Sequence, residues 1–133
     1  MPDAQIAHLL RRATFGASRQ MHAYALTDGY ARTVDRLVET PAAEPPALAG
    51  ADDATQAKPL NLQDLRTWWI DWMLRSPTPF AERITLFWHG HFTSDYRKVG
   101  LQVPYLYWQN LTWRRFALGD LRHFAYQVTV DPA

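Results

Sequence analysis

The chain has 133 residues, of which 47% are hydrophobic, so it is long and apolar enough to close the core of one domain. Its 14 basic and 13 acidic residues leave a net charge of +1, which argues against nucleic acid and anionic membranes as partners. Because cysteine is absent, disulfides, thiolate metal sites and cysteine nucleophiles are excluded.

The N-terminal residues lack the pattern of a secretory signal, which is a basic region followed by a long apolar stretch. The longest apolar runs are only a few residues, far short of the roughly 20 that span a bilayer. We therefore expect a soluble, cytoplasmic protein with no membrane contact. Export of a longer parent protein stays open.

Three short helices are predicted in the first forty residues. Apolar side chains recur at intervals of three and four over residues 3–14, which indicates an amphipathic helix. Ser18 is a suitable N-cap for a second helix, which extends through Leu26 before Gly29. A third helix follows and stops before Pro41.

Residues 40–60 form a long segment rich in proline and alanine. It contains four prolines and one glycine and has no hydrophobic period. Such a composition buries too little apolar surface to order itself. The sequence therefore predicts a flexible loop over residues 40–60.

Two helices at the centre of the fold are predicted after this loop. Asn61 can cap a tryptophan-rich helix over residues 61–75. Thr78 and Pro79 are typical of a helix start, and the next helix covers residues 79–88. The short connection implies that the two helices pack as an antiparallel pair.

Two more helices complete the prediction. Pro104 can open a helix that runs through Arg115, and Asp120 can cap a last helix that includes Val128. A short extended segment at residues 127–130 is the one exception left open. We predict one all-α domain over residues 1–133, an irregular bundle of about six or seven helices with a long Pro/Ala-rich loop.

Four segments carry an uncommon combination of motifs. They are AHLLRRATFG at residues 7–16, ERITLFWHGHF at residues 82–92, QN with RRFALG within residues 109–119, and DPA at residues 131–133. Their order and spacing resemble the N-terminal third of the bacterial family named domain of unknown function 1800 (DUF1800). The resemblance implies that the chain is the N-terminal part of a longer protein, with a sulfatase-like protein as a partner or pathway neighbour. No activity comes with it.

The sharpest chemical signal is the string His89-Gly90-His91 with Asp95 nearby. Imidazole and carboxylate groups are ligands for zinc and related metals. Residues two apart lie about 200° around a regular helix, so both histidines can face one ion only if Gly90 breaks the helix. A further ligand is also needed, from His8, Glu82 or a downstream segment.

Two other groups of residues have a chemical and a structural interpretation. Glu82 with Arg83, and Asp95 with Arg97 and Lys98, can form an acid–base pair, but weak surface ion pairs are the commoner use of such charges. The aromatic residues of segment 105–115 alternate with arginines as in some nucleic-acid binders. Their helical spacing favours ring packing with cation–π support.

We therefore carry two hypotheses of different classes. The favoured one is a non-catalytic interaction or structural domain, without a cofactor, that docks a protein partner or self-associates through exposed aromatic surface. The alternative is a fragment of a metal-dependent enzyme that holds a divalent transition metal such as zinc at His89, His91 and Asp95.

Overall fold

The computed structural model describes residues 2–51, 60–100 and 102–133 of the chain. Within these residues the chain forms seven helices and no strand, which confirms the all-α class and the expected number of helices. The helices are α1 (Pro2–Ala13), α2 (Arg19–Asp28), α3 (Tyr30–Glu39), α4 (Leu62–Arg75), α5 (Pro79–His91), α6 (Val103–Phe116) and α7 (Leu121–Thr129). None of the described helices is long and apolar enough to cross a membrane.

Three of the helices have the N-cap residues that the sequence predicts. The side chains of Ser18, Asn61 and Asp120 each accept a hydrogen bond from a backbone N–H in the first turn of their helix. Thr78 precedes α5 as predicted, but its hydroxyl makes no cap bond there. It accepts a hydrogen bond from the backbone N–H of Ala43 at 2.9 Å instead, and so ties the preceding loop to the start of α5.

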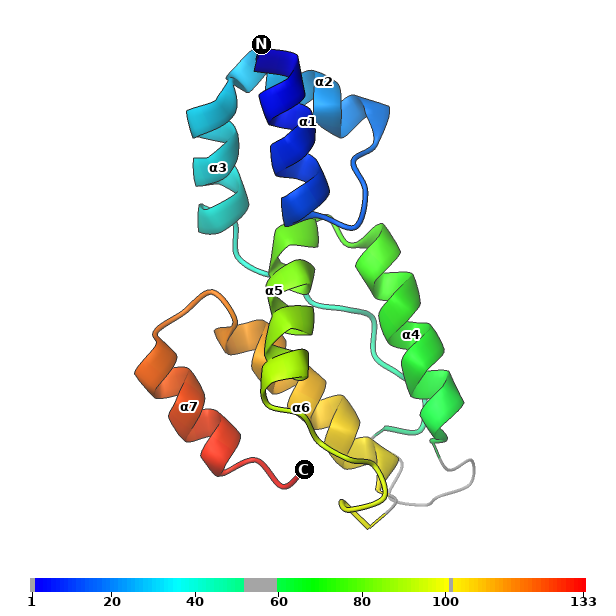
Figure 1. Cartoon of the computed structure of the whole chain (residues 1–133). Helices are drawn as coiled ribbons and strands as arrows, with labels where there is room; N and C mark the ends of the chain where they lie inside the picture. The colour runs from blue at the N-terminus through cyan, green and yellow to red at the C-terminus, as the bar shows by residue number, and fades with distance from the viewer. Residues whose placement is uncertain (1, 52–59, 101) are drawn as a thin grey trace.

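Helix α5 is the hub of the fold, because it contacts α1, α3, α4 and α6. Figure 1 shows α5 in the middle, with α1, α2 and α3 at one end and α6 and α7 at the other. Helix α4 runs antiparallel to α5 beside it, as predicted.

The prediction that α4 lies at the centre is wrong. Among the described helices it contacts only α5 and α6, and Leu65 is its one fully buried residue. Three of its apolar residues are tryptophans, whose indole N–H groups need polar partners. Trp69 and Trp72 therefore lie half-buried at the edge of the bundle, with their N–H groups directed at a carboxylate of α5.

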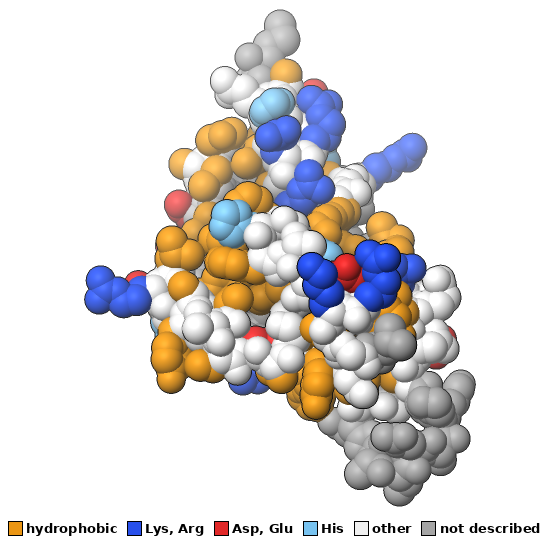
Figure 2. All heavy atoms as spheres, turned by 60° about the horizontal axis from the view of Figure 1, so that its bottom comes forward, with side chains coloured by type: hydrophobic (Ala, Val, Ile, Leu, Met, Phe, Trp, Pro, Cys, Tyr) orange, Lys and Arg blue, Asp and Glu red, His pale blue; other side chains and the backbone are white. Residues whose placement is uncertain are grey.

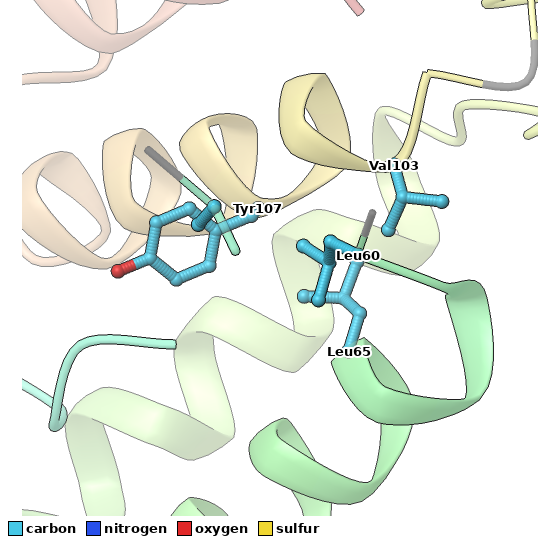
Figure 3. Packing of buried hydrophobic residues seen from close by; sticks show 5 residues of the cluster. Leu60, Leu65, Val103 and Tyr107 are labelled. Carbon is cyan, nitrogen blue, oxygen red and sulfur yellow. The ribbon is translucent and has the colours of Figure 1, made fainter. Parts of the chain in front are cut away.

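Two small hydrophobic clusters lie at opposite ends of the molecule. One joins α1 and α2 and consists of Ile6, Leu10 and Ala25, with Met21 packed against it. The other joins the ends of α4 and α6 and consists of Ala51, Leu60, Leu65, Val103 and Tyr107. Figure 3 shows the side chains of this second cluster meeting between the two helices. Between the clusters the buried residues include the polar side chains of Glu82, Thr85 and Arg114, and this middle region positions the candidate site.

The described part of the predicted loop packs on the helices. The indole N–H of Trp68 donates to the carbonyl of Pro46 at 2.7 Å, and Ala51 belongs to the second cluster. Residues 52–59, where the rest of the predicted flexibility falls, lie outside the described residues. At the other end of the chain α7 stays helical through Thr129, so the extended segment left open at residues 127–130 does not form.

Candidate functional site

A buried ion pair connects α5 to α6 in the middle of the molecule. Arg114 donates from Nε and Nη2 to the two carboxylate oxygens of Glu82, the second contact at 2.9 Å. The indole N–H groups of Trp69 and Trp72 donate to the same carboxylate at 3.4 and 3.0 Å. Four donors therefore satisfy Glu82, and such complete pairing is what makes a buried carboxylate tolerable.

A cavity of about 670 Å³ lies beside this pair, between α4, α5, α6 and the segment that follows α5. Helix α6 lines it with Leu106, Gln109, Asn110 and Trp113. These positions are spaced by three and four residues, so they share one face of the helix. Helix α4 adds Trp69 and α5 adds His89.

Asn110 is the unusual residue of this cavity. Its side chain is buried, and neither the amide nitrogen nor the amide oxygen has a hydrogen-bond partner among the described residues. The same holds for the indole nitrogen of Trp113, one turn further along α6. The side-chain amide N–H of Gln109, by contrast, donates to the carboxylate of Asp131 at 3.2 Å and to the carbonyl of Ala133 at 3.3 Å. Buried polar groups without partners are rare in folded proteins, because burial removes their hydrogen bonds to water and no hydrogen bond within the protein replaces them.

His89 forms part of the aromatic wall of the cavity. Its ring lies 5.0 Å from the ring of Trp69 and 5.2 Å from that of Trp113, measured between centroids. Burial among these rings lowers the pKa of His89 from its ordinary value of 6.5, because the charged imidazolium loses hydration there. The imidazole is therefore neutral at pH 7.

The structure separates the two histidines of the predicted metal site. Helix α5 continues through Gly90 to His91, so the helix break that the metal hypothesis needs at this glycine does not occur. His91 is exposed, with its ring 4.8 Å from that of Phe92, and it does not line the cavity. His89 and Asp95 do line the same cavity. Among the described residues no group of three or more His, Asp or Glu side chains is placed to hold a metal ion.

Asp95 is engaged by its neighbour at the rim of the cavity. Its carboxylate accepts hydrogen bonds from the side chain and the backbone N–H of Arg97. These bonds, with the nearby charge of Lys98, hold the pKa of Asp95 below its ordinary value of 3.8. The pairing of Asp95 with Arg97 foreseen from the sequence is thus formed, on the surface of the molecule.

A family model described as "Protein of unknown function (DUF1800)" matches residues 8–133, nearly the whole chain. The chain belongs to the DUF1800 family. No curated protein and no solved structure shows a significant match to it. The resemblance seen in the sequence is confirmed, and the function of this DUF1800 chain has to be argued from its own residues.

The buried ion pair of the DUF1800 chain escaped prediction from sequence. Glu82 was paired with the adjacent Arg83, whose guanidinium in fact lies over the ring of Phe15 at 5.4 Å. The true partner, Arg114, lies in another helix, and the sequence assigned it to an aromatic segment with cation–π support. One signal was available, since Arg114 shares a helical face with Tyr107, seven residues before it, on the same side of α6.

Proposed function

We propose that this DUF1800 chain is a non-catalytic helical binding domain that receives its partner in the cavity between α4, α5 and α6. The observation that carries the proposal is the cavity of about 670 Å³, whose lining residue Asn110 keeps a buried carboxamide without a hydrogen-bond partner among the described residues. Binding pockets commonly combine apolar and aromatic walls with a few placed polar groups, at volumes of roughly 300–1,000 Å³.

The charges around the cavity support binding over catalysis. The Glu82 carboxylate is already bound by Arg114 and two indole N–H groups. The Asp95 carboxylate is bound by Arg97. His89 packs between two indole rings, and no hydrogen bond from the described residues orients it as a base. The two carboxylates are engaged by donors and the imidazole is not oriented by one, so none of the three groups is arranged as a general acid or base.

The exposed apolar surface supports a protein as the partner. Ile70 and Leu74, one turn apart on α4, are 55% and 71% exposed, and Trp108 of α6 is 42% exposed. Figure 2 shows hydrophobic side chains over much of the face that it turns toward the viewer. Exposed apolar side chains are typical of surfaces that dock another polypeptide. A sulfatase-like partner, suggested by the family resemblance, stays a prediction.

Substitution of Asn110 by leucine tests the proposal without knowledge of the ligand. If Asn110 is kept for binding, its unpaired amide destabilises the free domain, and Asn110→Leu raises the free energy of unfolding by about 1–2 kcal/mol. The matched control is Gln109→Leu, which removes the bonds to Asp131 and Ala133 and lowers stability by about 1 kcal/mol. A loss of stability in Asn110→Leu comparable to the control contradicts the proposal, because Asn110 is then a structural residue.

A further inference from the structure

We infer that Trp68 is the centre of a recognition site for proline-rich polypeptide, which the chain fills with its own residues 41–46. These six residues, the strap, have the sequence PAAEPP and lie in the connection from α3 to α4 (Figure 1). A proline-rich segment of another polypeptide takes the site when the strap moves away. This site is separate from the cavity of the proposed function, because Trp68 is not among the described residues that line that cavity.

Trp68 binds the strap with the chemistry that suits a proline-rich chain. Its indole N–H donates to the carbonyl of Pro46 at 2.7 Å. Proline has no backbone N–H, so a proline-rich segment offers mainly carbonyl acceptors, and an indole offers only a donor. Such segments are also stiff and lose little conformational entropy when they bind, and aromatic-lined grooves recognise them for this reason.

Two buried residues hold the ring of Trp68 in place. The guanidinium carbon of Arg114 lies 5.8 Å from the ring centroid, and the ring of Tyr107 lies 5.1 Å away, at an angle of 58°. Arg114 is itself fixed by its ion pair with Glu82. Because neither neighbour belongs to the strap, Trp68 keeps its orientation when the strap leaves. The donor is therefore preorganised for another chain.

The strap is held to the helices by few contacts. Its hydrogen bonds to other described residues are the one from Trp68 and the one from the backbone N–H of Ala43 to the hydroxyl of Thr78, at 2.9 Å. No backbone–backbone hydrogen bond joins residues 41–46 to a described helix. A hollow of about 380 Å³ lies between the strap and α6, where Leu111 and Arg115 line it. A segment with so few bonds and incomplete packing opens at low cost in free energy.

The strap competes with any free segment for Trp68. A tethered segment acts at an effective concentration of about millimolar, so the closed strap weakens the binding of a free peptide. The apparent affinity for the peptide rises in proportion to the fraction of molecules in which the strap is open. Opening of the strap therefore controls access to the site.

The experiment titrates the protein with the peptide acetyl-PAAEPPA-amide, which has the sequence of residues 41–47. NMR follows the indole N–H signal of Trp68, assigned with Trp68→Phe. Trp88, whose N–H donates to the carbonyl of Ala117, is the internal control. A second peptide carries alanine in place of the three prolines.

Two variants separate release of the strap from a general effect of substitution. Thr78→Val removes the acceptor that holds Ala43 and keeps the shape of the side chain. Thr40→Val is the matched control, because the hydroxyl of Thr40 bonds within α3, to the carbonyl of Arg36, and does not hold the strap. Hydrogen exchange of the Trp68 indole N–H measures strap opening in each protein without added peptide.

We expect Thr78→Val to speed this exchange and to tighten binding of the proline peptide by about fivefold each, the effect of losing one hydrogen bond. Thr40→Val should behave as the native protein, and the alanine peptide should bind more weakly than the proline peptide. The inference is wrong if the alanine peptide binds equally well, or if neither the native protein nor Thr78→Val binds the proline peptide. Unchanged exchange in Thr78→Val also overturns it, because the strap is then not held as described.

Discussion

Arg114 and Glu82 lie 32 residues apart in the sequence and form an ion pair in which their side chains are 4% and 0% exposed. The pair joins α5 to α6, and the two indole N–H groups attach α4 to the same carboxylate. One carboxylate therefore fixes the relative positions of the three helices that enclose the cavity. The geometry of the candidate binding site depends on this contact.

Breaking the pair from one side should destabilise the domain strongly. Glu82→Leu leaves the Arg114 guanidinium buried without a counter-charge, and we expect the free energy of unfolding to fall by about 3–5 kcal/mol. The double variant Glu82→Leu/Arg114→Met removes both charges and should recover a large part of that loss. Urea denaturation of the two variants measures the difference.

The control for this prediction is the ion pair of Arg75 with Asp71 on α4, four residues apart and exposed. Asp71→Ala should change stability by no more than about 0.5 kcal/mol, because solvent screens a surface pair. If Glu82→Leu is as mild as Asp71→Ala, the buried pair does not hold the three helices together.

Stability should fall as the pH drops below 6.5 because of His89. Burial lowers the pKa of the folded-state imidazole below 6.5, whereas the unfolded chain keeps the ordinary value. Between these two pKa values the unfolded state binds a proton that the folded state does not, so acidification favours unfolding there. This contribution is complete above pH 6.5 and is lost as the pH falls toward the folded pKa.

Melting temperatures of the native protein and of His89→Phe, measured from pH 7.5 to pH 5, check this expectation. The variant should show a weaker decline over that range, since it retains a ring between Trp69 and Trp113 but cannot titrate. His91→Phe, at an exposed position on the same helix, should decline as the native protein does. Equal slopes in all three proteins speak against a buried neutral imidazole.

Phe124 attaches α7 to the bundle. Its side chain is 1% exposed, with its ring 5.0 Å from that of Trp88 and 5.5 Å from that of Phe92. Phe124→Ala should lower the free energy of unfolding by about 3–5 kcal/mol, through lost burial and the cavity left behind. Tyr126→Ala, at a site 63% exposed on the same helix, should change it by less than about 0.5 kcal/mol. Chemical denaturation that finds the two changes equal contradicts this packing.

Zinc titration tests the metal hypothesis for His89, His91 and Asp95. Because α5 is continuous through Gly90, the two histidines project about 200° apart around its axis. We expect zinc to affect the melting temperature of the native protein and of His91→Ala equally. Stoichiometric zinc in the purified native protein that is lost in His91→Ala restores the metal-dependent alternative.

The sequence by itself determined the helices of this DUF1800 chain. Their starts depend on local chemistry, as the caps at Ser18, Asn61 and Asp120 show, because a side-chain oxygen and the N–H groups it binds lie within one turn. The spacing of apolar residues indicated most of their extent for the same reason, although α5 continues past the predicted end at residue 88 to His91. Family membership was also predictable from the sequence, because short motifs and their order indicate it.

Only the tertiary structure decided which of these helices are neighbours and what lies between them. Glu82 meets Arg114 and Asn110 stays unpaired because of how α4, α5 and α6 pack, and no pattern within one helix encodes the partner of a buried polar group. The sequence drew attention to His89 and His91. They lie two positions apart in the chain, but the helix directs their side chains to different sides of its axis. Contacts across helices, set by packing in three dimensions, fixed the site.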